Sequence, residues 1–505
     1  MAVEVADATA IAGDGSTILR GASLSAAPGE LVAILGPSGS GKSTLLEAIA
    51  GLRPLADGSV RVDGDLAYVP QDDIVHRELP LRRTLRYAAA LRLPAGTPAA
   101  EIDRAVADAM AALDLSHRAD VRARDLSGGE RKRASIAVEL LTDPSVLLLD
   151  EPTSGLDPLA RAGLLRRLRG LAQAGATVLL STHVTRDAES CDAVVVLGAD
   201  GQVLYAGDVE AALASFGVRT LDEIYERIAA SGNGGIARRR NEAPARGDVP
   251  ARRPGFLRQC LLLTRRNAAV MRSSRLTLAI MAGSPLAVVL MFLVLFRAGA
   301  IAHPASALMI AFWIAFGAFF FGLTYGLLQI VTEVGIVRRE RVTGLRIGAY
   351  LASKVVTLVP VLAVVVAAML GALRALDRLP PAGWDVYGPV SITALLCGVA
   401  GLALGLLTSA AVRDPAQATL ALPMLCFPQV LFSGAMVPLA SMAGAGQAIA
   451  IGVSTRWGFE GIAHGLGLGF ARQPWIDWTI LGAFAVACLA AAYGVLRVRL
   501  SGPVR

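Results

Sequence analysis

Residues 36–43 have the types and spacing of a loop that binds phosphate. They are Gly36, Pro37, Ser38, Gly39, Ser40, Gly41, Lys42 and Ser43, which fit the pattern G-x-x-x-x-G-K-S. The glycines allow successive backbone N–H groups to point at phosphate oxygens, and the N-terminus of a following helix adds positive potential. Lys42 would reach the outer phosphates of a nucleoside triphosphate, and the Ser43 hydroxyl would ligate Mg²⁺. An accidental Gly-Ser-rich turn is the weaker interpretation, because Lys42 is one of only three lysines in the chain.

Two adjacent carboxylates are candidates for chemistry at these phosphates. Asp150 ends the apolar run 146–149, and Glu151 follows it. A carboxylate at the end of a buried strand can hold Mg²⁺ through water, and its neighbour can polarise the water that attacks the phosphate. An acidic pair at a strand end is by itself often only solvated, so this prediction depends on the phosphate loop. We expect Ser43, Gln71 and Asp150 as magnesium ligands.

Gln71 and His183 complete the candidate site. Gln71 lies 29 residues after Lys42, and its amide would fill the magnesium shell and sense the γ-phosphate. His183 follows the apolar run 177–181. A histidine just beyond a strand is more often a solvated or capped side chain than a catalyst, and only its relation to the other motifs favours catalysis. We predict Glu151 and His183 as the catalytic residues, and Thr44 and Gln71 as ATP contacts beside the loop.

A second anion site is predicted at residues 126–130, which precede the helical run 131–142. They are Leu126, Ser127, Gly128, Gly129 and Glu130. Two glycines and a serine at the start of a helix favour an anion, and one phosphate cluster does not need two such loops from a single chain. We therefore expect this loop to dock on the γ-phosphate of ATP held by a second copy. ATP would then join two soluble domains, and hydrolysis would release them.

Short apolar strands alternating with helices would position these loops. The expected strands are 31–35, 67–70, 146–149, 177–181 and 193–197, and the expected helices include 43–52, 99–113 and 131–142. A continuous apolar run is typical of a strand buried on both faces of a parallel sheet, and alternation with helices indicates an α/β fold. We predict an α/β P-loop domain over residues 1–230.

The composition separates a soluble half from an apolar half. Of the 505 residues, 54% are hydrophobic and 18% are charged, against about 25% charged in soluble proteins, which excludes an ordinary cytosolic enzyme. Residues 1–253 contain 29 Lys and Arg against 34 Asp and Glu, whereas residues 254–505 contain 19 against 7. This basic excess lies at the ends of apolar runs, so it indicates membrane topology and not nucleic-acid binding. The scattered cysteines indicate neither zinc nor disulfides.

Six apolar runs approach or exceed the roughly 20 residues that cross a bilayer as a helix. They are residues 276–296, 305–332, 355–373, 388–412, 416–438 and 478–496. We predict an all-α transmembrane domain of six helices over residues 276–505, with a re-entrant segment at 439–477. Before it, residues 231–254 are expected to form a flexible linker and residues 255–275 an amphipathic connecting helix at the membrane surface.

The distribution of basic residues predicts the orientation. With the N-terminus inside, the cytoplasmic flanks of the spans hold 14 basic residues and the external loops hold 5, which follows the positive-inside rule. The N-terminal residues lack the basic and apolar regions of a cleaved signal peptide. We expect a multi-pass protein of the cell (inner) membrane, with the N-terminal domain and the C-terminus in the cytoplasm.

The motifs resemble, in type and order, those of ABC-transporter ATPases. The resemblance implies that residues 36–43 are the Walker A loop, Gln71 the Q-loop, residues 126–130 the signature, Asp150 and Glu151 the Walker B pair, and His183 the switch histidine. It also implies a D-loop at Ser154, Gly155, Leu156 and Asp157. Residues 126–157, and an ATPase placed before a membrane domain, are similar to half-transporters of the G subfamily.

The resemblance implies a dimer of two half-transporters, either identical or different. Each of its two sites for ATP and Mg²⁺ would combine the Walker motifs of one chain with Ser127 and Gly129 of the other. The chain departs from the family pattern in that no aromatic residue precedes Tyr68. Adenine would then be held by apolar contact, for which Ile11 is a candidate.

Two further departures concern the external side. The cysteine-bearing external loop of eukaryotic members is absent, which together with the high Ala, Gly and Arg content indicates a bacterial relative. Ala435 and Met436 stand where some drug-exporting relatives place two leucines that plug the exit. The sequence therefore does not predict the form of the gate at the external exit.

The leading functional hypothesis is an ATP-driven exporter. The spans are rich in Leu, Val and Ala and lack paired acids for a proton relay, which favours a lipid-like or amphipathic substrate. Their polar exceptions could line a path for the substrate, although helix–helix hydrogen bonding is the role expected for most of them. They are Thr324, Tyr325, Gln329, Thr332, Thr419, Gln429 and Ser433. The cytoplasmic segment 333–354 is expected to contact the ATPase near Gln71 and to tilt the spans.

Two other functions are weighed against export. One is an ATP-driven device that moves no solute but signals to, or remodels, a partner in the envelope; the lack of a large external domain disfavours it. The other is import, which would ordinarily require a separate solute-binding protein.

Overall fold

The computed structural model describes residues 1–71, 75–231, 255–469 and 473–501. The chain forms two compact units, residues 1–255 and residues 256–502. Apart from Ser231, the predicted linker lies outside the described residues, as do Arg472 and Arg505, two of the arginines that predicted the orientation.

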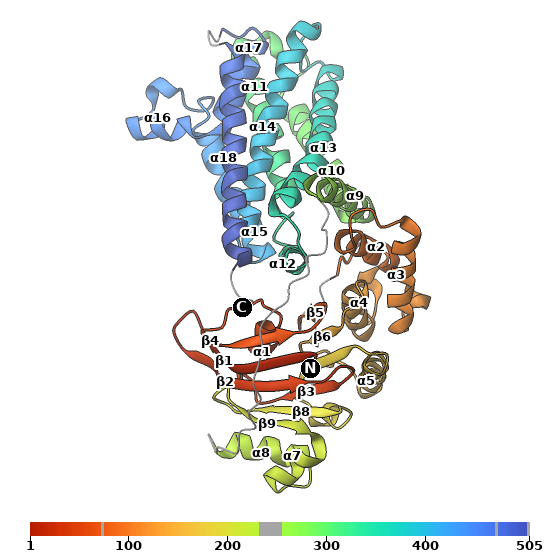
Figure 1. The fold of residues 1–505 in the computed structure, drawn as a ribbon. Coiled ribbons are helices and arrows are strands. Elements are labelled where there is room, and N and C mark those ends of the chain that lie inside the picture. The colour runs from red at the N-terminus through yellow and green to blue at the C-terminus, as the bar shows by residue number, and fades with distance from the viewer. Residues whose placement is uncertain (72–74, 232–254, 470–472, 502–505) are drawn as a thin grey trace. The chain divides into compact units, whose positions relative to one another are not determined.

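The first unit is built on a six-stranded sheet with the strand order β5-β6-β7-β3-β8-β9 (Figure 1). The strands are β3 (Leu31–Leu35), β5 (Leu66–Val69), β6 (Val146–Leu149), β7 (Thr177–Thr182), β8 (Ala193–Leu197) and β9 (Val203–Asp208). All neighbouring strands from β5 to β8 pair in parallel, and β9 is antiparallel to β8. This confirms the predicted α/β fold. Parallel pairing brings the carboxyl ends of β3, β5, β6 and β7 to one edge, where ligands of such sheets bind.

Helices follow most of these strands along the chain. They are α1 (Lys42–Ile49), α2 (Leu81–Arg92), α3 (Ala99–Ala112), α4 (Gly128–Leu140), α5 (Pro158–Gln173), α6 (Thr185–Ala188), α7 (Val209–Phe216) and α8 (Leu221–Ser231). Alternate residues of β3 enter two different apolar cores. Leu31 and Leu35 pack in the core that includes α2, α3 and α4, whereas Val32 and Ile34 pack in the opposite core. The strand before the phosphate loop is therefore buried on both faces.

A second sheet, with the order β2-β1-β4, was not predicted from the sequence. It consists of β1 (Val3–Ile11), β2 (Thr17–Ala26) and β4 (Asp57–Val62), paired antiparallel. Its apolar side chains share the core of Val32 and Ile34. Ile11, the candidate for adenine contact, ends β1 with 48% of its surface exposed.

The second unit is helical. Its helices are α9 (Phe256–Ser273), α10 (Arg275–Leu295), α11 (Pro304–Leu327), α12 (Val334–Val342), α13 (Ile347–Ala375), α14 (Trp384–Ala411), α15 (Pro415–Leu431), α16 (Gly444–Ile451), α17 (Ser454–Gly465) and α18 (Pro474–Ser501). Within the described residues, five of them are long and apolar enough to cross a membrane: α10, α11, α13, α14 and α18.

The run 416–438, predicted as the fifth of six spans, differs from the expectation. Its helix α15 has 17 residues, contains Pro423 and Pro428, and ends at Leu431, before a turn in which Gly434 has a φ of 84°. At 1.5 Å per residue such a helix extends about 25 Å, which is shorter than a bilayer core of about 30 Å. The short helices α16 and α17 occupy the segment predicted as re-entrant, whose depth in the bilayer stays a prediction.

Helices α11 and α14 pack backbone to backbone. A Cβ at Gly322 of α11 would lie 1.8 Å from the backbone oxygen of Gly398, and one at Gly401 of α14 would lie 2.2 Å from that of Phe319. Only glycine permits so close an approach, as at interfaces of small residues between membrane helices. The backbones of α11 and α14 therefore lie in direct contact at these glycines.

Candidate functional site

The phosphate loop connects β3 to α1. Gly39 and Gly41 have φ values of 86° and 91°, in the left-handed region that glycine adopts without strain. A Cβ at Gly41 would also lie 2.9 Å from Leu19 Cδ2. The position thus requires glycine for two separate reasons, and α1 begins directly after it, at Lys42.

The Lys42 ammonium group is directed at this loop. Its Nζ donates hydrogen bonds to the backbone oxygens of Gly36 at 2.8 Å and Pro37 at 2.9 Å. Burial lowers the pKa of Lys42 from its usual value, and the carboxylates of Glu151 and Asp150 oppose that shift. An ammonium group held in this way is placed to exchange carbonyl oxygens for phosphate oxygens. ATP binding by residues 36–44 stays a prediction.

Ser43 and Asp150, two of the predicted magnesium ligands, lie together. Ser43 Oγ donates to Asp150 Oδ1 at 3.0 Å, and Ser181 Oγ donates to the same oxygen at 2.6 Å. A hydroxyl and a carboxylate oxygen are the hard ligands that Mg²⁺ prefers, with water or phosphate oxygens filling its other positions. The donor set therefore fits Mg²⁺. Gln71 is the third predicted ligand. Its amide nitrogen donates to Glu151, so only its amide oxygen could ligate the metal.

Glu151 brings Gln71 and His183 together. Gln71 Nε2 donates to Glu151 Oε2 at 3.2 Å, and His183 Nδ1 lies 3.4 Å from Glu151 Oε1. The three residues follow β5, β6 and β7, so neighbouring parallel strands deliver them to one edge of the sheet. This arrangement can hold a carboxylate beside the phosphates as an acceptor for the proton of an attacking water.

The backbone of Glu151 has an uncommon conformation. Its φ is 45°, in the left-handed region that few residues other than glycine adopt, at a cost on the order of 1–3 kcal/mol. Its N–H donates to Ser181 Oγ at 2.9 Å. The strained turn and this hydrogen bond direct the side chain toward Gln71 and His183. Such strain is typical of functional positions.

The polar residues that support this edge were not predicted from the sequence. Ser181 bonds both Asp150 and the Glu151 N–H. Asp187 of α6 is completely buried, and its Oδ2 accepts hydrogen bonds from Thr153 Oγ1 at 2.5 Å and Thr182 Oγ1 at 3.0 Å. It thereby ties the segment after Glu151 to the segment before His183. The one signal in the sequence was the pair of hydroxyl residues directly before His183.

The signature residues lie at the start of α4. Ser127 is the N-cap, and its side chain accepts the N–H of Glu130 while the Glu130 carboxylate accepts the N–H of Ser127. Burial raises the pKa of Glu130, but the Ser127 N–H and Arg118 outweigh burial and hold that pKa below its usual value. Ser127 itself is exposed. Contact between the signature and a second nucleotide stays a prediction.

The D-loop residues lead into α5. Gly155 has a φ of 72°, and Asp157 caps the helix by accepting the N–H groups of Leu159 and Ala160, each at 3.0 Å. This capping fixes where α5 begins. A role of residues 154–157 between two copies stays a prediction.

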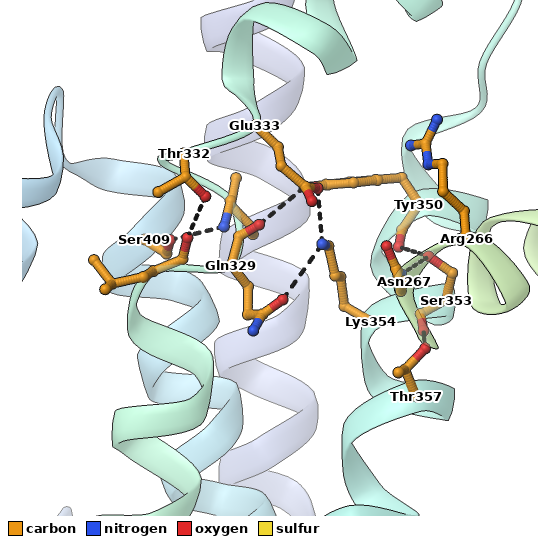
Figure 2. Close-up of polar contacts among 12 residues, drawn as sticks. Arg266, Asn267, Gln329, Thr332, Glu333, Tyr350, Ser353, Lys354, Thr357 and Ser409 are labelled. Carbon is orange, nitrogen blue, oxygen red and sulfur yellow. Dashed lines mark hydrogen bonds and ion pairs between the residues drawn. The ribbon is translucent and has the colours of Figure 1, made fainter. Parts of the chain in front are cut away.

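In the second unit, the helix α12 lies within the predicted coupling segment and is anchored by ion pairs at both ends. Glu333, at its N-terminus, pairs with Lys354 of α13, with 2.7 Å between Oε2 and Nζ. Tyr350 donates to the same carboxylate oxygen at 3.0 Å, and Lys354 Nζ donates to Gln329 Oε1 at 3.4 Å (Figure 2). Near the other end, Glu340 accepts a bidentate pair of hydrogen bonds from Arg266 of α9.

The turns beside α12 are also held by side chains. Ser409 of α14 accepts the backbone N–H groups of Ile330 and Val331, each at 3.0 Å. The amide of Gln259 bonds the Gly344 oxygen at 3.1 Å and the Arg346 N–H at 3.0 Å. The segment between α11 and α13 is therefore fixed to α9, α13 and α14.

Comparison with known proteins gives matches to both units. The family model described as ABC transporter matches residues 19–154, which contain every predicted motif up to Glu151 and the first residue of the D-loop, Ser154. The model described as ABC-2 type transporter matches residues 258–466. A solved structure described as the ATP binding subunit of an ABC transporter has 30% identity and a TM-score of 0.41, over 45% of this chain and 100% of that chain.

Relatives among the curated proteins are also described as ABC transporters. An ABC transporter ATP-binding/permease protein of Mycobacterium tuberculosis is 33% identical over 488 residues, which is 88% of this chain and 55% of that protein. ABC transporter G family member 7 of Arabidopsis thaliana is 40% identical over 210 residues, 38% of this chain and 29% of that protein. The chain thus spans about half the length of the first relative and less of the second. Because models for both halves match in this order, the chain belongs to the ABC transporters and joins an N-terminal ABC ATPase domain to an ABC-2 type membrane domain.

Proposed function

We propose that this protein hydrolyses ATP and uses the cycle to drive transport across a membrane. The observation that carries the proposal is the cluster at the carboxyl ends of three strands, in which Gln71 and His183 orient Glu151. Asp150 and Ser43 lie beside it, next to the phosphate loop. A carboxylate in that place would accept the proton of the attacking water, while Lys42 and the loop N–H groups would bear the charge of the phosphates. Ser43, Asp150 and the Gln71 amide oxygen would hold Mg²⁺, which would supply positive charge against the phosphates.

The active form is proposed to be a dimer of half-transporters. Ser127 is exposed at the N-terminus of α4, where a helix favours an anion. Its hydroxyl and the free N–H groups of the first turn would contact the γ-phosphate of ATP held by the second chain. ATP then favours the closed dimer because only that form offers both sets of contacts.

Coupling to the membrane is proposed to depend on α12. Its two ion pairs join it to α13 and α9: Glu340 pairs with the buried Arg266, and the half-buried Glu333 pairs with the buried Lys354. Buried pairs are poorly suited to bending, because separation of one pair leaves a charge without compensation. A displacement of α12 by the ATPase would therefore move α9 and α13 with it.

This proposal predicts that replacing Lys354 by Met uncouples ATP hydrolysis from transport. The Glu333 carboxylate, with 13% of its side chain exposed, would lose its ammonium partner. We expect transport in reconstituted vesicles to fall at least about tenfold, while ATP hydrolysis stays within about threefold of the wild type. The matched control is Arg374→Met at the far end of α13, where the side chain is exposed. An unchanged ratio of substrate moved to ATP hydrolysed in K354M would contradict the prediction.

The proposed substrate is lipid-like or amphipathic, and the proposed direction is export. The seven polar residues of the spans all have protein partners, and the hydroxyls of Thr324, Thr332 and Thr419 donate to backbone oxygens one turn earlier in their own segments. Each of these seven side chains thus bonds within the protein, which favours apolar side chains as the main contacts for a substrate.

The test of the substrate uses the full chain in vesicles with fluorescent lipid analogues or a radiolabelled sugar. ATP-dependent movement of the lipid to the side away from the ATPase domain would support the proposal. Movement of the sugar alone would overturn the substrate class. Hydrolysis without movement of either would favour the signalling or remodelling alternative.

A further inference from the structure

Lys132 joins the signature helix α4 to the Q-loop. The residue is 5% exposed, and its Nζ donates a hydrogen bond to the backbone oxygen of Gln71. Neither the proposed chemistry nor the signature motif assigns it a role. It is one of three lysines in a chain with 48 basic residues.

The Gln71 oxygen lies where the backbone leaves the sheet. The last ladder contact of β5 is made by the Val69 oxygen, which accepts the Asp150 N–H at 2.9 Å. Pro70 follows and has no N–H to continue the ladder. The ammonium group of Lys132 holds the backbone oxygen of the residue after Pro70, Gln71, and the charge strengthens the hydrogen bond. It thereby orients the residue whose amide reaches Glu151 at 3.2 Å.

The same helix is fixed at two other points. Its N-terminus is the capping box of Ser127 and Glu130. Near its C-terminus, Glu139 forms a buried bidentate pair with Arg92 of α2. Lys132 and Glu139 are seven residues apart, which is about two helical turns, so they lie on one side of α4. A shift of Ser127 along the helix axis would therefore be passed to Lys132.

We propose that Lys132 is a positioning residue that holds Gln71 against Glu151 and makes this arrangement depend on the engagement of Ser127. The link to a second nucleotide rests on the proposed function. Gln71 and Glu151 of one chain would then be correctly placed only when the signature of that chain is docked on the ATP held by the second chain. Lys132 acts through Gln71 and does not itself touch ATP.

The first test is Lys132→Met in the full chain, with Lys132→Arg as the conservative variant and Arg166→Met, an exposed arginine of α5, as the control. Loss of a charge-assisted hydrogen bond should lower kcat for ATP about tenfold and raise the Mg²⁺ concentration for half-maximal rate. The Kd for nucleotide should stay within about twofold because the phosphate loop is unchanged. The Hill coefficient for ATP should fall toward 1. K132R should recover at least half of the loss in kcat, and R166M should behave as the wild type.

The second test is a double-mutant cycle with Gln71→Ala. If Lys132 acts through Gln71, K132M should lower kcat less than about twofold in the Q71A background. An equal effect in both backgrounds, or a rise in Kd together with a lower Tm, would assign Lys132 a general structural role and overturn the inference.

The third measurement does not depend on ATP hydrolysis. Amide hydrogen exchange of residues 66–71 in the nucleotide-free protein should be faster in K132M and unchanged in R166M. Equal exchange in K132M and wild type would overturn the positioning role. A wild-type protein without ATP hydrolysis would instead overturn the proposed function and the link to a second nucleotide.

Discussion

Replacing Glu151 by Gln should lower the rate of ATP hydrolysis at least about 100-fold and leave ATP bound. The amide has the size of the carboxylate but cannot accept a proton from water. The phosphate loop and Asp150 are unchanged, so nucleotide binding should persist. Hydrolysis is measured as phosphate release at saturating ATP, and binding as nucleotide retained after gel filtration. If ATP joins two chains, the variant should also be recovered as a stable dimer with ATP.

Two controls separate this result from a general loss of activity. Glu189→Gln changes an exposed carboxylate in the same unit and should hydrolyse ATP at the wild-type rate. Lys42→Ala should lose nucleotide binding as well as hydrolysis, because Lys42 faces the loop. Hydrolysis by E151Q at a rate near that of the wild type would exclude Glu151 as the base and would remove the observation on which the proposed function rests.

Replacing Arg92 by Met should destabilise the ATPase domain by about 3–5 kcal/mol. The side chains of Arg92 and Glu139 are 3% and 5% exposed, and two hydrogen bonds of 2.6 and 2.8 Å join them. Removal of the guanidinium group leaves the Glu139 carboxylate buried without its partner. The domain should therefore unfold at a Tm lower by on the order of 10 °C, measured by calorimetry of the full chain.

The matched control lies on the same helix. Arg86 pairs with Asp103 at 2.9 Å, but these side chains are 53% and 56% exposed, and such pairs contribute roughly 0–1 kcal/mol. Arg86→Met should therefore shift the Tm far less than R92M. The double variant R92M/E139L should recover part of the loss, since no buried charge remains. Equal shifts for R86M and R92M would contradict the account.

The phosphate loop and the parallel sheet were predictable because their signals are local. Continuous apolar runs specify strands buried on both faces, and the predicted strands at 31–35 and 146–149 have those bounds in the structure. The grouping of Glu151 with Gln71 and His183 then follows from parallel pairing, which places the ends of neighbouring strands at one edge. The positions of the strand ends, taken together with the phosphate loop and the other motifs, therefore predicted this part of the site.

Other features depend on pairs that are distant in sequence. Nothing near Asp187 indicates that it bonds Thr153 and Thr182, and nothing near Arg266 indicates Glu340, which is 74 residues away. The sheet of β1, β2 and β4 was missed because its strands contain few strongly apolar residues, and because β4 pairs with β1 across the intervening β2, β3 and α1. The length of the helix predicted at 416–438 was overestimated because hydropathy does not indicate where a helix ends. Helix α15 ends before the turn at Gly434.

The burial of all three lysines makes the folded chain nearly inert to reagents that acylate amines. Lys42, Lys132 and Lys354 are 7%, 5% and 2% exposed, so their amines are shielded in the folded protein. Acylation of a particular lysine would therefore report that its surroundings have opened, with Lys42 shielded further by nucleotide. Mass spectrometry of three modified peptides would follow the phosphate loop, the Q-loop and the base of α13 separately in one sample.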